Sequence, residues 1–232
     1  MLNGSKITAL VAAGGLGVRM KLDIAKPLLL VRNKPVVIYT LEVLEAHPLI
    51  DEIVLVFNKD GLDDAKEAVK RYNISKVARV VAGGATRKDS VASGLGAVDS
   101  ATRLVVIHDG VRPFVDECAI TRVIEAAENS GAAVLGVPVK STIKHVDKNL
   151  DIELTLKRDS LWEIQTPQVF DRELIQAAYA RSGGDFVSDD ASLVELMGKK
   201  VRVVTGSYFN IKITTQEDLA FAEAIVAART AG

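Results

Sequence analysis

Six short apolar runs, rich in β-branched residues, recur along the chain and restrict its fold more than any other feature. They occupy residues 7–12, 52–57, 78–82, 103–108, 132–139 and 201–204. The runs are continuous rather than alternating, as in strands that are covered by helices on both faces. Parallel sheets are built from such strands. The sequence therefore predicts an α/β protein with a mostly parallel sheet.

Segments with helical spacing lie between these runs. They occupy residues 35–47, 63–72, 90–98 and 117–131. Asp116 and Gly131 bracket the last of them as the expected N-cap and C-cap. Because strand and helix alternate at least four times, we expect a doubly wound sheet with its ligand at the carboxyl ends of the strands.

Residues 141–158 depart from this rhythm. They contain two charged, partly alternating stretches around residues 148–150, which predicts a β-hairpin inserted into the α/β unit. A long polar hairpin cannot bury itself alone. The pattern fits either a dimerisation arm that packs on a second subunit or a plain surface hairpin. After it, residues 214–217 have the composition of a capped start to a terminal helix.

Length, charge and cysteine content narrow the class of protein. The 232 residues suit one domain, 1–232, and 29 Lys+Arg against 30 Asp+Glu give a net charge of −1. Such a balance provides no general attraction for nucleic acid or an anionic membrane, so a polyanion needs a local site. The single cysteine fits a reducing cytoplasm. No apolar run approaches the ~20 residues that span a bilayer.

A glycine-rich turn follows the first predicted strand. Gly14, Gly15 and Gly17 would let backbone N–H groups approach phosphate oxygens, and the nearby Arg19 and Lys26 add two positive charges. That combination suits a nucleoside triphosphate. The alternative interpretation is a tight turn that serves packing alone.

Two familiar phosphate motifs do not fit this turn. A P-loop requires Gly-Lys-Ser or Gly-Lys-Thr, which is absent here. The dinucleotide fingerprint would place Met20 where a third small residue is needed for helix packing. A nicotinamide enzyme is thus disfavoured, although Asp60 after the second strand keeps it as an alternative.

Two further loops follow the third and fourth strands, at residues 83–90 and 108–113. Asp109 is placed to hold a metal or a sugar hydroxyl, and Arg112 to clamp a phosphate. The alternative is an Asp-closed turn with a surface ion pair. We expect His108 to be a packed residue at the strand end rather than a catalytic base.

Taken together, the motifs resemble those of the 2-C-methyl-D-erythritol 4-phosphate cytidylyltransferase family. They occur in the family's order at 12–20, 26, 83–90, 108–113, 141–144, 158–168 and 210–212. The resemblance spans residues 6 to about 222. It implies a Rossmann-like nucleotidyltransferase of the non-mevalonate isoprenoid pathway, which joins CTP to a polyol phosphate and releases pyrophosphate.

The resemblance also implies roles for individual residues. Arg19 and Lys26 would stabilise the transition state at the α-phosphorus, while Arg158 and Lys212 would position the acceptor phosphate. No general base is needed, because that phosphate is already ionised at pH 7. Magnesium would bridge the triphosphate oxygens, with few direct protein ligands.

The remaining implied contacts divide into two groups. Contacts to CTP would come from Ala13, Gly14, Gly15, Gly17, Gly84, Arg87 and Ser90. Contacts to the acceptor would come from Asp109, Arg112, Thr142 and Thr166. The hairpin that carries Thr142 and Arg158 would reach across a homodimer.

Two other functions stay open. The ribitol 5-phosphate cytidylyltransferase of teichoic-acid synthesis shares the glycine loop, Asp109-x-x-Arg112 and the segment 210–215. Residues 141–144 and Leu161-Trp162 are more similar to the methylerythritol enzyme. The other alternative is a catalytically silent nucleotide-sensing module, against which the retained cations Arg19, Lys26, Arg158 and Lys212 argue.

Overall fold

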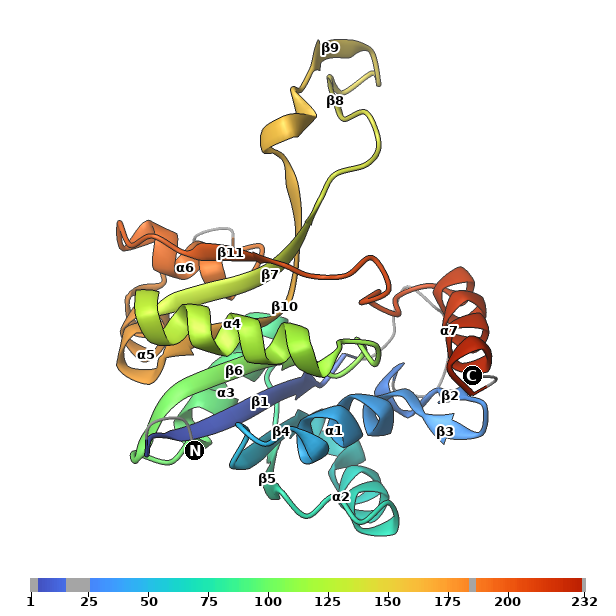
Figure 1. Cartoon of the computed structure of the whole chain (residues 1–232), viewed down its shortest axis with the longest axis vertical. Coiled ribbons are helices and arrows are strands. Elements are labelled where there is room, and N and C mark those ends of the chain that lie inside the picture. Colours follow the sequence, from blue (N-terminus) through green and yellow to red (C-terminus); the bar gives the residue numbers. More distant parts are fainter. Residues whose placement is uncertain (1–3, 16–25, 184–186, 231–232) are drawn as a thin grey trace.

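The protein, seen here in a computed structural model that describes residues 4–15, 26–183 and 187–230, is built on a seven-stranded sheet (Figure 1). The strand order is β11-β7-β10-β6-β1-β4-β5. The strands are β1 (Lys6–Ala13), β4 (Glu52–Phe57), β5 (Val77–Ala82), β6 (Thr102–Asp109), β7 (Ala132–Pro138), β10 (Trp162–Asp171) and β11 (Arg202–Thr205). Only β10 runs antiparallel to its neighbours, so the predicted mostly parallel sheet is confirmed.

Helices cover both faces of this sheet. They are α1 (Val36–Ala46), α2 (Leu62–Arg71), α3 (Arg87–Ala97), α4 (Glu117–Ser130), α5 (Arg172–Arg181) and α6 (Asp190–Leu196), while α7 (Gln216–Thr230) lies beside the sheet. One core joins α1, α2 and α4 to the sheet, and a second joins α3, α5 and α6 to its other face. Strand β1 contributes Ile7, Ala9 and Val11 to the first core and Leu10 to the second. This alternation explains the continuous apolar run, and the doubly wound class is confirmed.

A third, smaller core attaches α7 beside the sheet. It contains Val31, Phe114 and Ala222, and it lies against the short hairpin of β2 (Leu30–Val31) and β3 (Lys34–Pro35). None of the helices in the described part of the chain has the length and apolar character that a membrane span needs.

The predicted helix boundaries are confirmed at α4. The Asp116 side chain accepts a hydrogen bond from the backbone N–H of Ala119 at 2.7 Å, and Gly131 ends the helix with a φ of 78°. Near α7, the backbone N–H of Thr215 donates to Asp218 Oδ2 at 2.9 Å. The acidic residue that caps the start of α7 is therefore Asp218.

The apolar patterns of the sequence did not reveal β10, α5 or α6 as separate elements. Strand β10 carries Gln165, Thr166 and Gln168 at buried positions and Pro167 between them. These polar residues interrupt the apolar run by which the other strands were recognised. Their burial is compensated by hydrogen bonds to distant segments: Gln165 donates to the Ser207 carbonyl, Thr166 accepts from the Asp109 N–H, and Gln168 donates to Asp189.

The inserted hairpin is present as predicted. Strands β8 (Lys144–Val146) and β9 (Ile152–Thr155) pair antiparallel and project away from the body beyond the ends of β7 and β10 (Figure 1). Both strands are exposed along their whole length. We call residues 141–158 the arm.

Candidate active site

The glycine turn after β1 forms one wall of the candidate site. Ala13 is buried at the end of β1, and Gly14 lies so close to α3 that a Cβ on it would come within 3.4 Å of Ser90 Oγ. Gly15 is exposed. Gly17 and Arg19 lie outside the described residues. Lys26 begins a short 3-10 helix, Lys26–Leu28.

The loop between β5 and α3 faces that turn. A Cβ on Gly83 would lie 2.6 Å from Ser90 Oγ, so any larger residue would force the loop or the serine to move. Ser90 Oγ donates to the Thr86 carbonyl at 2.9 Å. Thr86 and Asp89 form a reciprocal capping box at the start of α3. The two glycine loops thus meet around one buried serine, where a ligand can approach backbone rather than side chains.

Asp109, the last residue of β6, collects three cations at the neighbouring strand end. Its Oδ1 accepts from Arg87 Nε at 3.1 Å, and its Oδ2 accepts from Lys212 Nζ at 2.9 Å and from Arg112 Nε at 3.3 Å. Burial alone would raise the pKa of Asp109. The three cations, Arg87 first among them, outweigh burial and hold this pKa well below its usual range. Asp109 is therefore ionised throughout the physiological range.

Thr166 and His108 support this carboxylate from behind. The backbone N–H of Asp109 donates to Thr166 Oγ1 at 3.0 Å, and Thr166 Oγ1 lies 2.9 Å from His108 Nδ1. His108 Nε2 lies 3.1 Å from the Arg112 carbonyl, which can only accept, so the ring carries its proton on Nε2. Burial lowers the pKa of His108 to about 4. The expected packing role of His108 is confirmed. Its ring is fully buried and neutral and both nitrogens are hydrogen-bonded, so it cannot act as a general base.

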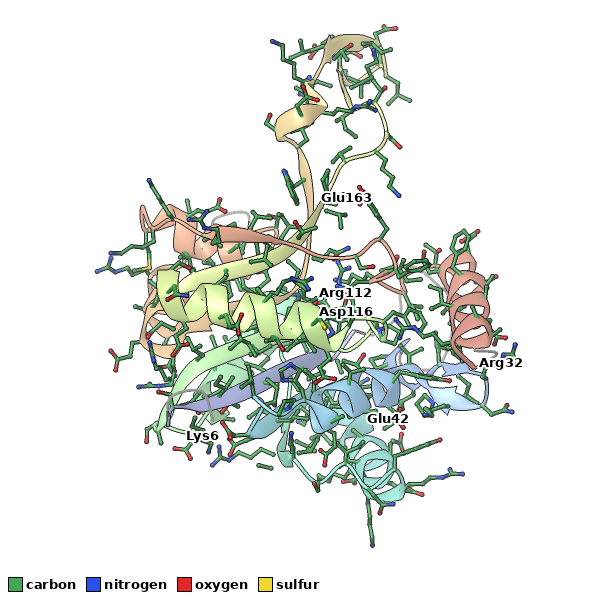
Figure 2. All side chains as sticks on the ribbon, in the orientation of Figure 1. Lys6, Arg32, Glu42, Arg112, Asp116 and Glu163 are labelled. Atoms are coloured by element: carbon green, nitrogen blue, oxygen red, sulfur yellow. The ribbon has the colours of Figure 1, made fainter. Side chains whose placement is uncertain are left out.

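A pocket of about 400 Å³ opens beside Asp109 at the base of the arm. Arg112 and Lys212 line it with positive charge, and Glu163, Asp218 and Gln165 line it with oxygen acceptors. Figure 2 shows Arg112 in the body and Glu163 at the base of the arm above it. Arg112 is held in place by a 2.8 Å bond from its Nη1 to the Asn210 carbonyl. The pocket has the size and the charge pattern for a small phosphorylated polyol.

Two of the predicted acceptor contacts do not join this cluster within one chain. Thr142 and Arg158 are exposed on the arm, and Arg158 Nη1 donates to the Lys140 carbonyl at 2.8 Å. Both lie on the segment that projects away from the body (Figure 1). A single chain therefore brings together Arg87, Asp109, Arg112, Thr166 and Lys212, and leaves the two arm residues apart.

Behind Arg87 the structure places residues that sequence reasoning missed. The completely buried Asp190 accepts two hydrogen bonds from the Arg87 guanidinium, and the Tyr179 hydroxyl donates to the same carboxylate. Asp190 and Tyr179 come from α6 and α5, which the apolar pattern did not reveal. The adjacent acids Asp189 and Asp190 were the one available signal.

A doubly wound sheet whose strand ends carry two glycine loops and a pocket with Arg112 and Lys212 in its lining defines the class as an α/β enzyme acting on phosphorylated ligands. The family model described as 2-C-methyl-D-erythritol 4-phosphate cytidylyltransferase matches residues 7–228. The chain belongs to this family.

Individual relatives agree over the full length. A 2-C-methyl-D-erythritol 4-phosphate cytidylyltransferase of Syntrophus aciditrophicus is 46% identical, with 95% of this chain and 96% of the relative covered. One from Alkaliphilus metalliredigens is 42% identical, with 100% and 98% covered.

Solved structures give the same result. A 4-diphosphocytidyl-2C-methyl-D-erythritol synthase from Anaerococcus prevotii matches with a TM-score of 0.86 at 38% identity, covering 97% of each chain. The Thermus thermophilus 2-C-methyl-D-erythritol 4-phosphate cytidylyltransferase matches with a TM-score of 0.78 at 31% identity, covering 95% of this chain and 98% of that one.

Proposed function

We propose that this chain is a transferase that moves the cytidylyl group of CTP onto 2-C-methyl-D-erythritol 4-phosphate, as the family's name describes. The products are pyrophosphate and the CDP-polyol. The observation that carries the proposal is the Asp109 carboxylate, which holds Lys212 and Arg112 at the mouth of a pocket beside the glycine loops. A triphosphate on the glycine loops and a polyol phosphate in the pocket would meet at the strand ends.

The chemistry follows from the charges. An oxygen of the acceptor phosphate attacks the α-phosphorus of CTP, and the bond from that phosphorus to the leaving pyrophosphate oxygen breaks. The electron pair leaves with the pyrophosphate. Because both reactants are anions, the protein must chiefly neutralise charge and align the attack. Lys212 and Arg112 serve the acceptor phosphate, and Arg19 and Lys26 serve the α-phosphorus.

Apart from Arg87, the nucleotide contacts remain those that the resemblance implies. Gly14 and Ser90 lie together in the structure, so the base and ribose would rest against backbone of the two glycine loops. Arg87 has a more specific role, because its guanidinium nitrogens donate to Asp109 and Asp190. It therefore orders the site rather than binding cytidine through those nitrogens.

Magnesium belongs to the proposal as a companion of CTP. Among the described residues no group of three or more His, Cys, Asp or Glu is arranged to hold a metal ion, and both oxygens of Asp109 are occupied by cations. The triphosphate oxygens would carry the ion, with few direct protein ligands.

A homodimer completes the proposed site. The arm exposes Leu150, Ile152 and Leu154, with 79%, 64% and 56% of their surfaces accessible. A two-stranded hairpin with exposed apolar side chains is marginal in water and gains stability against another surface. A partner's arm lying over the pocket would bring its Thr142 and Arg158 to the acceptor phosphate.

The composition supports a proposal for the compartment and the partners of the enzyme. With one cysteine and a net charge of −1, the proposal is a single-domain cytoplasmic enzyme without nucleic-acid or membrane partners. Its partners are CTP, the polyol phosphate and a second copy of the chain.

The test is pyrophosphate release from CTP and magnesium with each of two acceptors, 2-C-methyl-D-erythritol 4-phosphate and ribitol 5-phosphate. We expect turnover with the first and a Lys212→Ala variant that loses most of it. The exposed Lys200→Ala is the matched control and should retain wild-type rates. Preference for ribitol 5-phosphate would reverse the acceptor assignment. Binding of CTP with no pyrophosphate from either acceptor would favour the nucleotide-sensing alternative.

A further inference from the structure

A buried carboxylate lies behind the site, where no substrate can reach it. Asp190 is 0% exposed and is the first residue of α6. Its Oδ1 accepts from Arg87 Nη1 at 3.0 Å and from the Tyr179 hydroxyl at 2.6 Å, and its Oδ2 accepts from Arg87 Nη2 at 2.7 Å. This is a bidentate pair with a third donor fixing one oxygen.

Arg87 connects Asp190 to the carboxylate of Asp109 beside the pocket. Its remaining nitrogen, Nε, donates to Asp109 Oδ1 at 3.1 Å. Because the guanidinium is planar and its N–H groups form a rigid fork, fixing two nitrogens on Asp190 fixes the direction of the third. The orientation of the Asp109 carboxylate follows, and with it the position of Oδ2, which holds Lys212 and Arg112.

Stability does not by itself explain this network. A buried ion pair contributes little net stability compared with apolar residues of the same volume, because the desolvation of two charges offsets their attraction. Nor does α6 need Asp190 for its start. Asp189 caps α6 by accepting from the Ser192 N–H at 3.1 Å, and Gln168 Nε2 donates to Asp189 at 2.7 Å.

We infer that Asp190, supported by Tyr179, is a positioning residue for the acceptor phosphate. It holds Arg87, and through Arg87 it holds the Asp109 carboxylate that aims Lys212 and Arg112 into the pocket. The inference rests on the proposed function, because it assigns the pocket to the acceptor.

The experiment uses the full chain and compares Asp190→Asn with Asp189→Asn. Asp190→Asn keeps the size of the side chain but loses the charge that holds the guanidinium. We expect kcat/KM for the polyol phosphate to fall ~10- to 100-fold, because small displacements of positioning groups have effects of that order. The dissociation constant for CTP, measured without acceptor, should stay within about twofold of wild type.

The neighbouring variant separates positioning from folding. Asp189→Asn leaves one acceptor oxygen for two donors, the Ser192 N–H and Gln168 Nε2, and should lower the melting temperature while leaving KM for the acceptor unchanged. Tyr179→Phe removes one hydrogen bond to Asp190 and should weaken the acceptor step in the same direction, by less. It decides the matter if Asp190→Asn does not fold.

Three results would overturn the inference. One is an Asp190→Asn enzyme with lower stability and unchanged acceptor kinetics. Another is an equal loss of CTP and acceptor binding. In both cases an active wild-type enzyme leaves the proposed function intact. A wild-type chain that releases no pyrophosphate with the methylerythritol acceptor would instead overturn the proposed function, and the inference with it.

Discussion

Lys212 Nζ lies 2.9 Å from Oδ2 of Asp109, which joins the loop before α7 to the carboxyl end of β6. The lysine is more than a third exposed and the aspartate only 6%. The cation thus faces the pocket from a buried anchor. Such an arrangement presents a positive charge to the pocket while it holds the lysine side chain in place. Alignment of two anions requires a cation that is fixed in this way.

Removing the cations proposed to act at the α-phosphorus should slow chemistry more than it weakens binding. We expect Arg19→Ala and Lys26→Ala each to lower kcat by ~10²- to 10³-fold, the usual cost of losing one donor to a developing anion. Steady-state kinetics and CTP titration measure the two effects separately. Lys200→Ala again serves as the control. A change confined to KM for CTP would contradict the assigned role.

The close approach of Gly83 to Ser90 predicts that alanine at Gly83 weakens CTP binding, whereas alanine at the unhindered Gly96 does not. In Gly83→Ala the new Cβ would lie 2.6 Å from Ser90 Oγ, so the loop or the serine must move. We expect weaker CTP binding. In Gly96→Ala the new Cβ meets nothing within 4 Å, and alanine is the better helix former by up to ~1 kcal/mol. Calorimetric CTP titration and thermal melts should show a binding loss only for the first.

The residues that sequence patterns located are those attached to regular strand ends. The glycine turn, Asp109 and Arg112 follow buried apolar runs, and parallel strands bring such residues to one edge of a sheet. Asp190 and Tyr179 could not be located this way. Their partner Arg87 is far from them in sequence. An ion pair between such distant residues produces no repeating pattern in the sequence around either of them. Strand β10 was missed for a related reason, because its buried residues are polar and are satisfied by distant loops.

Burial of His108 predicts a pH dependence of stability. Its pKa is lowered to about 4 in the folded protein, whereas an unfolded histidine titrates near 6.5. Between these values the unfolded chain binds more protons, so the free energy of unfolding falls as pH drops from 6.5 to 4. The gap corresponds to about 3 kcal/mol. Urea unfolding of wild type and His108→Asn across this range measures it.

The difference between the two unfolding curves isolates this contribution. Burial also lowers the pKa of His47, which adds to the slope of both proteins equally. Asp109 acts in a separate window: its pKa is depressed, so the stability it contributes is present above ~4 and is lost below that value. Above pH 7 the two curves should run parallel. Equal slopes between pH 6.5 and 4 would show that His108 is not the titrating group.

Arg158 provides the test of the arm. An arginine can hold a phosphate in a bidentate fork, whereas a lysine offers one mobile charge. Arg158→Lys should therefore raise KM for the polyol phosphate or lower kcat despite keeping its charge. The affinity for CTP without acceptor should stay near that of wild type.

Subunit mixing then shows which chain supplies Arg158. If the arm reaches across a homodimer, combining Arg158→Ala with Lys26→Ala gives heterodimers that hold one intact site and one doubly defective site. Random exchange makes half of the dimers mixed, so activity should recover to about a quarter of wild type. Mixing Lys26→Ala with Lys212→Ala is the matched control. Both of those residues belong to the body, so each site of the heterodimer keeps one defect and stays inactive. Recovery in the first mixture alone requires the arm of one subunit to complete the site of the other. No recovery between subunits that demonstrably exchange would reject the cross-subunit assignment of Arg158.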